Sequence, residues 1–358
     1  MSAASWLARV AGGAGAAAVA AVATGVVVER RVVRSRKLST ARVEEMSSLR
    51  SEPRPVTTSD GLQLHAEVDE IAPYKGKLHK QKQKTYADVT LVFVHGYALN
   101  LNCWYFQRDA LRGKYRMVFY DQRSHGLSPQ SSRGSATIDQ LGDDLAAVIQ
   151  QLVPKGKVVL VGHSMGGMSI MALAERHPEL FGERVAGTAL IATTAGNLRP
   201  HHILSKLIPD GVGEFLAPRL VAALASAPEL VDSARKRGSN IGFLVADAFA
   251  FGGDAPDAEV EFLDQMLAGT SMRVIGEFFP TFGALDKYAA LERLDEKLAL
   301  IIGASKDRIT SVEHSRDMAK AMPNARYVEC EGAGHMVIFE AREIVNEEIE
   351  ALVERARA

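Results

Sequence analysis

The feature that most restricts the fold is a serine between two glycines, at a point where a buried strand runs into a helix. The apolar run 157–161 leads into Gly162-His163-Ser164-Met165-Gly166-Gly167, and a helical pattern follows to residue 176. A G-x-S-x-G at such a junction holds the serine in a strained turn with its hydroxyl exposed. Residues two positions to either side must be small, as Gly162 and Gly166 are. The pattern predicts Ser164 as a nucleophile.

Strand and helix patterns alternate on both sides of this junction. Predicted strands cover 89–94, 115–120, 157–161, 185–192, 298–302 and 326–330, and predicted helices cover 102–112, 138–152, 165–176, 311–322 and 344–356. This alternation predicts an α/β fold, a doubly wound and mostly parallel sheet with helices on both faces. The strands are continuous apolar runs, as expected when both faces are covered. A hairpin over 56–70, turning at Ser59-Asp60-Gly61, precedes the sheet.

The alternation breaks between residues 197 and 286. This stretch has several helical patterns punctuated by Pro and Gly, and no strand pattern. An insertion late in an α/β sheet predicts a helical cap over the active site. The expected organisation is therefore an N-terminal hydrophobic anchor with a basic flank (1–37), a linker (38–55), a core (56–196 and 287–358) and the cap (197–286).

A nucleophilic serine needs a base within hydrogen-bond reach, and the base needs an orienting group. His335 lies in a glycine-rich loop after the last predicted strand and is the predicted base. Asp307 follows the preceding strand and is the predicted acid, with Asp295 and Glu331 as alternatives. The chain order Ser, Asp, His is the order expected for this arrangement.

Acyl transfer at Ser164 also requires N–H groups that face the developing oxyanion. The N–H of Met165 stands at a helix N-terminus, where negative charge is favoured. The second predicted donor is the N–H of Tyr97, which follows a strand end, with Ala98 as the less favoured choice. We interpret His95 as a structural residue that holds this loop.

From about residue 56 to the end, these motifs resemble the α/β-hydrolase fold with an inserted cap. The similarity is greatest to esterases, lipases and cofactor-free haloperoxidases. The matching segments are 91–97, 121–128, 162–167, Asp307 and Gly334-His335. Segment 121–128 resembles the family's D-x-R-G-x-G-x-S loop, with Ser124 where glycine is usual. The resemblance implies that Asp121, Arg123 and His125 order this loop, and a serine at the elbow argues against haloalkane dehalogenases and epoxide hydrolases, which use aspartate.

The N-terminus has a composition of its own. Residues 11–28 contain no charge and no proline, and Trp6 and Leu7 extend them toward the ~20 residues of a membrane-spanning helix. Five basic residues follow between 30 and 37. The leading interpretation is a single membrane anchor that leaves the catalytic domain on the cytoplasmic side. A secretory signal peptide cleaved near 21–23 and an Ala-rich surface helix are the alternatives.

Other features narrow the class of function. A net charge of −1 gives no indication that the protein binds nucleic acid. No phosphate-binding or dinucleotide-binding glycine loop is present, and the adjacent pair His201-His202 is poorly spaced for one metal ion. We therefore expect no cofactor and no metal. Cys103 and Cys330 form no C-x-x-C pair and are expected to be free, buried thiols.

The leading hypothesis is hydrolysis of a carboxylic ester, with a small-molecule or lipid ester as substrate. Apolar residues of the cap favour an acyl pocket, although packing of the cap on the core would also explain them: Leu204, Leu207, Phe215, Leu216, Phe243, Phe249, Met266, Met272, Phe278, Phe279 and Phe282. Perhydrolysis, acyl transfer and carbon–carbon cleavage on the same triad stay open, as does a catalytically silent, membrane-tethered binding protein. Substrate identity and oligomeric state are not encoded in any motif.

Overall fold

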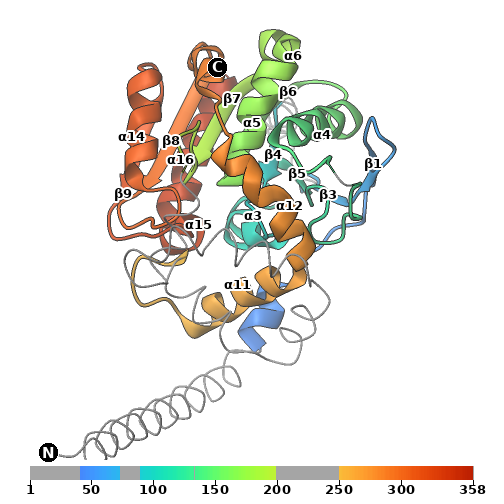
Figure 1. Cartoon of the computed structure of the whole chain (residues 1–358), viewed down its shortest axis with the longest axis vertical. Coiled ribbons are helices and arrows are strands. Elements are labelled where there is room, and N and C mark those ends of the chain that lie inside the picture. Colours follow the sequence, from blue (N-terminus) through green and yellow to red (C-terminus); the bar gives the residue numbers. More distant parts are fainter. Residues whose placement is uncertain (1–40, 73–88, 133, 199–249, 358) are drawn as a thin grey trace, which may run out of the picture.

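A seven-stranded sheet in the order β3-β5-β4-β6-β7-β8-β9 organises the molecule (Figure 1). The computed structural model describes residues 41–72, 89–132, 134–198 and 250–357. Strand β3 pairs antiparallel with β5, and every other neighbouring pair in this sheet is parallel. The predicted α/β class is thus confirmed, with one antiparallel strand at the edge. The strands are β3(Ala66–Asp69), β4(Val89–Val94), β5(Arg116–Tyr120), β6(Lys157–His163), β7(Val185–Ile191), β8(Leu298–Ala304) and β9(Arg326–Cys330).

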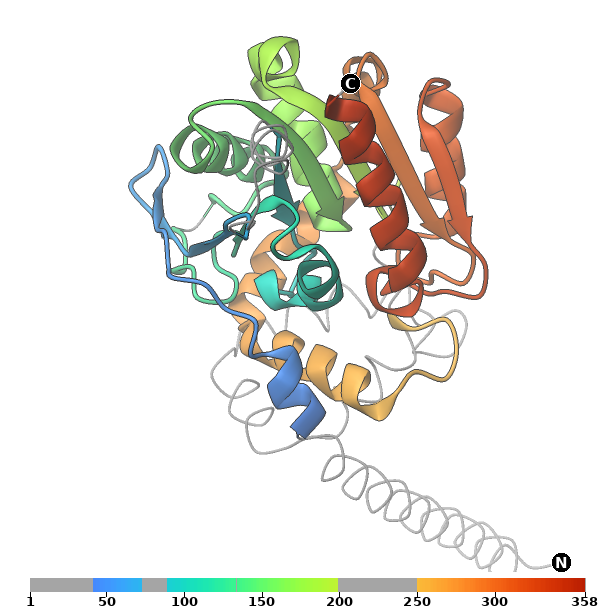
Figure 2. The same ribbon diagram turned by 180° about the vertical axis from the view of Figure 1, so that it is seen from behind.

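Helices cover both faces of this sheet. Side chains alternate along each strand, so Phe93 and Val161 of one face pack in the cluster that includes α3 and α16, whereas Val92 and Leu160 pack with α4 and α5. Figure 2 shows α16 and α3 in front of the sheet, on the side opposite to α4 and α5. The helices are α3(Tyr105–Leu111), α4(Ile138–Leu152), α5(Met165–Arg176), α6(Pro178–Glu183), α13(Tyr288–Asp295), α14(Val312–Ala321), α15(Val337–Glu340) and α16(Arg342–Arg357).

Most predicted boundaries lie within two residues of those observed. The helices predicted over 138–152 and 165–176 are α4 and α5. The helix expected over 102–112 begins as the 3-10 turn η1(Leu101–Trp104) and continues as α3. The second strand of the hairpin predicted over 56–70 is split at His65, because β2(Gln63–Leu64) pairs with β1(Val56–Thr57) while β3 joins the main sheet. The short helices α6 and α15 escaped prediction because neither is long enough to show a helical period.

Residues 41–55, which we expected to be part of a linker, pack against the core. Residues 41–46 are helical, and Val43 and Met46 are only 3% and 1% exposed. They stand three positions apart, so both project from one face of the helical turn. Both figures place this turn beside α11(Asp257–Gly269). The backbone N–H of Ser51 then donates to the carboxylate of Glu67 at 2.9 Å, which ties the following segment to β3.

The described part of the stretch 197–286, which the sequence predicts to form a cap, contains α11 and α12(Met272–Gly283). Of the apolar cap residues predicted to line a pocket, Met266, Phe278 and Phe282 are buried, and those between 204 and 249 lie outside the described residues. Within the part of the chain that the structure describes, none of the helices combines the length and apolarity needed to cross a bilayer. The predicted anchor over residues 11–28 lies outside that part.

The burial of Met46 gives a test of whether residues 41–46 belong to the domain. Met46→Ala should lower the free energy of unfolding by about 2–4 kcal/mol, because it removes a buried side chain and leaves a cavity. Chemical denaturation measures this change. Arg42→Ala is the matched control in the same turn, since that side chain is 55% exposed and an exposed ion pair contributes little. Equal, small effects of both variants would show that this segment does not pack on the core.

Candidate active site

The turn at Ser164 has the backbone strain that its sequence pattern predicted. Ser164 has φ 53° and ψ −120° between the end of β6 and the start of α5. A Cβ on Gly162 would lie 2.7 Å from the backbone of Gly166, and a Cβ on Gly166 would lie 2.0 Å from the carbonyl oxygen of Val94. Both positions therefore require glycine for steric reasons. The turn is held by the N–H of Ser164, which donates to the Ile191 carbonyl at 3.0 Å.

Three predicted residues from distant parts of the chain meet at this turn. The Nε2 atom of His335 lies 3.0 Å from Ser164 Oγ, and its Nδ1 atom lies 2.8 Å from Asp307 Oδ2. Because a carboxylate can only accept, the Nδ1–H of His335 donates to Asp307, and Nε2 is left to accept the serine proton. Each of the three residues is 7% exposed, so the group is nearly enclosed but reachable.

The carboxylate of Asp307 is itself held in place by a turn. Its Oδ1 accepts from the backbone N–H groups of Ile309 at 2.7 Å and Thr310 at 2.9 Å. The hydroxyl of Thr310 lies 2.9 Å from Asp307 Oδ2 and 2.8 Å from the carbonyl of Ala192. Sequence reasoning missed Thr310, although an Asp side chain often accepts from a backbone N–H two residues further on, as Asp307 does from Ile309. The turn leaves Oδ2 directed at His335.

The alternatives considered for the acid do not reach His335. Asp295 accepts from the side-chain amide of Asn324 at 2.9 Å. Glu331 is exposed to solvent. Asp307 is therefore the carboxylate that the structure brings to the imidazole.

His163, between Gly162 and Ser164, is a site residue that the sequence analysis left without a role. Its Nε2–H donates to the main-chain carbonyl of His335 at 2.9 Å. Burial, and next the nearby charge of His335, lower the pKa of His163 to about 3. His163 therefore stays neutral, and its hydrogen bond holds the backbone of His335.

The two N–H groups predicted to bind the oxyanion belong to Met165, which follows Ser164 in the chain, and to Tyr97. Within the described residues, neither the Tyr97 N–H nor the Met165 N–H donates to any acceptor. The loop that carries Tyr97 lies close to the nucleophile, because a Cβ on Gly96 would be 3.2 Å from Ser164 Cβ. The hydroxyl of Tyr97 donates to the carbonyl of Ile275 in α12 at 2.5 Å. Tyr97 thus connects the candidate oxyanion loop to the cap.

His95 and Gln122 hold this loop from behind. Nε2 of His95 accepts from the backbone N–H of Gln122 at 2.9 Å, so its Nδ1–H donates to the carbonyl of Gly96 at 2.7 Å. The Gln122 amide donates to the carbonyl of His95 at 2.6 Å and accepts from Ser169 in α5 at 2.8 Å. The structural role expected for His95 is observed, and Gln122 is a partner that sequence reasoning missed.

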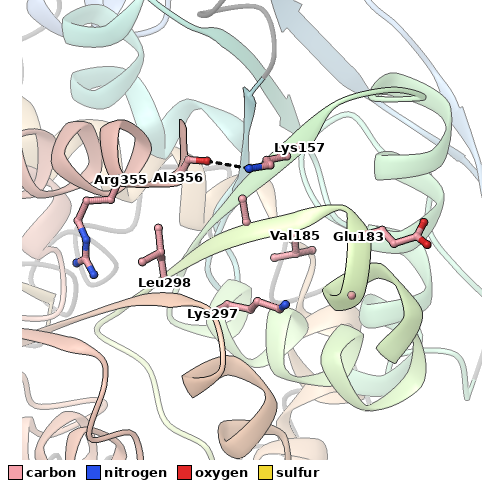
Figure 3. A pocket seen from close by; sticks show the side chains of 9 residues that line it. Lys157, Glu183, Val185, Lys297, Leu298, Arg355 and Ala356 are labelled. Carbon is pink, nitrogen blue, oxygen red and sulfur yellow. Dashed lines mark hydrogen bonds between the residues drawn. The ribbon is translucent and has the colours of Figure 1, made fainter. Parts of the chain in front are cut away.

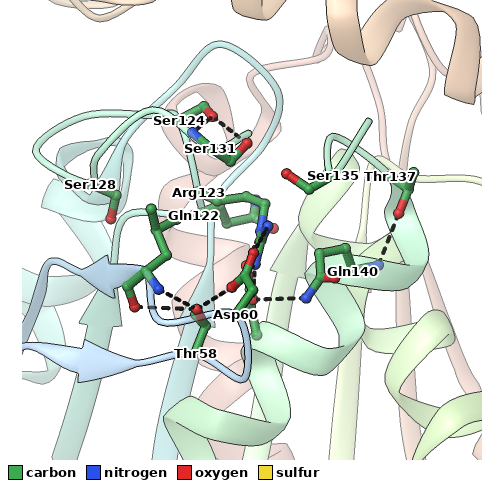
Figure 4. Close-up of polar contacts among 12 residues, drawn as sticks. Thr58, Asp60, Gln122, Arg123, Ser124, Ser128, Ser131, Ser135, Thr137 and Gln140 are labelled. Atoms are coloured by element: carbon green, nitrogen blue, oxygen red, sulfur yellow. Dashed lines mark hydrogen bonds and ion pairs between the residues drawn. The ribbon is translucent and has the colours of Figure 1, made fainter. Parts of the chain in front are cut away.

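The loop 121–128 is ordered by charged and polar side chains (Figure 4). Asp121 accepts from the N–H groups of Leu101 and Leu127, both at 2.8 Å. Arg123 is fully buried and pairs with Asp144 at 2.6 Å and with Asp60 at 3.0 Å. These contacts agree with the ordering role expected for Asp121 and Arg123, and they attach the loop to the hairpin turn and to α4.

Ser124, the departure from the family's usual glycine, has φ 67°. This positive φ explains why glycine is usual there, since other residues adopt it at a cost. Ser124 compensates locally, because its hydroxyl accepts from the backbone N–H of Ser131 at 2.9 Å. The hydrogen bond to Ser131 thus helps to hold Ser124 in this conformation.

A hollow of about 270 Å³ lies at the amino ends of the parallel strands, opposite to the end at which Ser164 stands (Figure 3). Its lining includes Lys157, Val185 and Leu298, the first residues of β6, β7 and β8. Ser164 follows the other end of β6, so this hollow is separate from the triad. Within the described ranges, no group of three or more His, Cys, Asp or Glu side chains is placed to hold a metal ion. His201-His202 lies outside those ranges, and Cys103 and Cys330 are free and buried.

Because His163 donates to the backbone of His335, we predict that Ser164 reacts at its normal rate only when residue 163 is a hydrogen-bond donor. His163→Leu removes the donor and leaves a buried carbonyl unpaired, a cost of about 1–3 kcal/mol. We expect Ser164 to react with a fluorophosphonate at least about tenfold more slowly, since 1.4 kcal/mol corresponds to a factor of ten. His163→Gln, whose amide can donate from the position of Nε2, should restore most of the rate. A Leu variant that reacts like the unaltered protein would contradict this role.

Comparisons with known proteins place the chain in a family. A model of the alpha/beta hydrolase fold matches residues 89–342. The chain is 28% identical over 267 residues to the dihydrolipoyllysine-residue acetyltransferase component of the acetoin cleaving system of Pseudomonas putida, covering 74% of this chain and 63% of that relative. It is therefore similar to less than two thirds of that protein's length.

A second relative is similar over more of its length. The chain is 27% identical over 269 residues to 3-oxoadipate enol-lactonase 2 of Acinetobacter baylyi, covering 74% of this chain and 88% of the relative. The structure resembles an esterase from Exiguobacterium antarcticum with a TM-score of 0.62 and 20% identity, covering 85% of this chain and 100% of that one. With the family model matching most of its length, the chain belongs to the α/β-hydrolase fold family.

Proposed function

We propose that this protein is a serine hydrolase that cleaves carboxylic esters through an acyl-enzyme on Ser164. The observation that carries the proposal is the unbroken chain of contacts from Ser164 Oγ to His335 at 3.0 Å and from His335 to Asp307 at 2.8 Å. Buried, aligned contacts of this kind activate a hydroxyl that is otherwise a weak nucleophile. The catalytically silent alternative has no support in this geometry.

In the first half of the reaction, Ser164 Oγ attacks the ester carbonyl carbon while its proton moves to Nε2 of His335. Asp307, which accepts from Nδ1–H, stabilises the imidazolium that forms. The carbonyl oxygen becomes an oxyanion and accepts hydrogen bonds from the N–H groups of Tyr97 and Met165. When the tetrahedral intermediate collapses, His335 donates its proton to the leaving alcohol, and the acyl group stays on Ser164.

In the second half, a water molecule takes the place of the alcohol. His335 accepts a proton from this water as it attacks the acyl carbon, and the same two N–H groups hold the oxyanion. Collapse returns the proton to Ser164 and releases the carboxylic acid. An acceptor alcohol or peroxide in place of water would give acyl transfer or perhydrolysis on the same triad.

Esters are the substrate class that the relatives favour. One relative is named for an enol-lactonase, and a lactone is a cyclic ester. One structural neighbour is described as an esterase. At 20% identity, this likeness supports the fold and not the substrate. We propose further that the substrate carries a long acyl chain. The support is the apolar composition of the stretch predicted to form the cap, since Phe278 and Phe282 of α12 are themselves buried against Tyr97, with ring centroids 6.4 and 5.0 Å away.

We also propose that residues 11–28 anchor the protein in a membrane, with the catalytic domain on the cytoplasmic side. The support is in the sequence: an uncharged stretch followed by the basic residues between 30 and 37. A hydrolase anchored in this way would act on lipid or acyl esters at the bilayer.

The proposal is tested with nitrophenyl esters whose acyl chains run from two to sixteen carbons. We expect hydrolysis with a maximum at long chains, and a loss of about 10⁴-fold or more in Ser164→Ala, because a triad acts as a unit. Asp307→Asn should cost a similar factor by leaving the imidazole in the wrong tautomer. Ester hydrolysis is measured by release of nitrophenol.

The outcomes separate the open alternatives. Activity only on short, soluble esters would reject the acyl-chain proposal and keep the esterase. If Ser164 takes up a fluorophosphonate but no ester is hydrolysed, ester cleavage is wrong, and product analysis with peroxide, acceptor alcohols or a carbon–carbon substrate takes its place.

The anchor is tested by separating membranes from supernatant by centrifugation and measuring which fraction contains the protein. The full chain should sediment with membranes and stay there in high salt, whereas a variant lacking residues 1–37 should remain in the supernatant with its soluble-ester activity. A full chain found in the supernatant would reject the anchor. A shortened product with a new N-terminus near residue 23 would favour the signal peptide.

A further inference from the structure

Glu340 in α15 joins the catalytic histidine loop to the root of the cap. Its Oε2 atom accepts from the backbone N–H of Gly334 at 2.7 Å, and its Oε1 atom accepts from the backbone N–H of Gly252 at 2.8 Å. Gly334 directly precedes His335. Gly252 lies in the segment that leads into α11 of the cap. A single carboxylate therefore bridges the two segments.

The two bridged segments lie in direct backbone contact. A Cβ on Gly252 would stand 2.2 Å from the carbonyl oxygen of Gly332, and a Cβ on Gly334 would stand 2.4 Å from the nitrogen of Gly252. On the other side of His335, the N–H of Met336 donates to the carbonyl of Ala250 at 2.8 Å. Both chain neighbours of His335 are thus held through the segment 250–252.

A second contact strengthens the same connection. Arg342, at the start of α16, pairs with Glu259 in α11 at 2.7 Å, and Glu259 is only 7% exposed. The ion pair follows the Glu340 bridge by two residues along the chain. Both contacts join the same two parts of the chain: α11 with the segment before it, and the histidine loop with the start of α16.

Glu340 carries a half-buried carboxylate, which is unusual for a side chain that serves only for packing. Among the described residues, this carboxylate forms no ion pair with a cation. Burial raises its pKa. The hydrogen bonds from the N–H groups of Gly252 and Gly334 offset part of this rise, and the charges of Glu259 and Asp307 add to it. Burying an unpaired carboxylate costs free energy that an apolar side chain would avoid. A carboxylate has two acceptor oxygens on one rigid group, and the bridge between the N–H groups of Gly252 and Gly334 requires both of them.

We propose that Glu340 is a positioning residue that couples the seating of the cap to the placement of His335. The inference rests on the proposed function, in which His335 activates Ser164. When the segment 250–252 is seated, Glu340 holds Gly334, and the imidazole reaches both Ser164 and Asp307. When the segment 250–252 moves away, Met336 loses its bond to Ala250 and Glu340 loses its bond to Gly252. The histidine loop is then held less firmly, and the triad loses its alignment.

The experiment measures the rate at which Ser164 reacts with a fluorophosphonate, which requires an aligned triad but no knowledge of the substrate. Glu340→Ala removes both acceptors and should slow the reaction by about 10- to 100-fold, the effect of a misplacement near 1 Å. Glu340→Gln keeps one acceptor and should fall between Ala and the unaltered protein. Glu347→Gln, an exposed glutamate on α16, is the control and should react normally.

Coupling to the cap is tested by Gly252→Ala, which leaves Glu340 in place but forces the cap root away from the histidine loop. It should slow the reaction as Glu340→Ala does. The double variant should be no more than about threefold slower than the slower single variant, because both changes break one connection and coupled sites are not additive. Rates that multiply would show that the two residues act separately and would overturn the coupling.

A readout independent of reactivity is the NMR signal of the proton between His335 and Asp307. It should shift or broaden in Glu340→Ala and Gly252→Ala and stay unchanged in Glu347→Gln. If Glu340→Ala lowers the melting temperature but leaves both this signal and the reaction rate unchanged, Glu340 only stabilises the fold and the proposal is wrong. If the unaltered protein reacts with the fluorophosphonate but cleaves no ester, the ester proposal fails while this one stands.

Discussion

The strained backbone at Ser164 is the constraint on which the rest of the site depends. A positive φ at a residue with a side chain costs of order 1–3 kcal/mol, and it persists only because surrounding contacts outweigh it. The N–H of Ser164 donates to Ile191 of the neighbouring strand, and its carbonyl accepts from the hydroxyl of Thr193 at 2.7 Å. The parallel pairing of β6 with β7 therefore stabilises the turn that presents the nucleophile.

Asp307, the predicted acid, and His335, the predicted base, lie in loops that follow the carboxyl ends of β8 and β9. Each is restrained by contacts with backbone atoms. Asp307 is held by the N–H groups of its own turn, whereas His335 is held by residues from other elements: His163 at its carbonyl, and Ala250 and Glu340 at its neighbours. Asp307 is thus positioned locally. His335 depends on the elbow and the cap together, and this makes it the member of the group most sensitive to movement.

The cap meets the site at two places. At one, Tyr97 of the candidate oxyanion loop donates to Ile275 of α12. At the other, the segment before α11 contacts the histidine loop through Gly252. An inserted domain attached at both the oxyanion side and the base side can shape a substrate entrance and also align the reacting groups.

The sequence by itself determined the parallel sheet, Ser164 at the elbow, and Asp307 and His335 as its partners, because strand periodicity and the glycine spacing are local properties. It did not reveal Thr310, His163, Gln122 or Glu340, nor that residues 41–46 pack on the core. These side chains act on backbone atoms of segments up to 172 positions away, as His163 does on His335. Only tertiary structure brings such atoms together, since no local pattern records which distant N–H or carbonyl a side chain will meet.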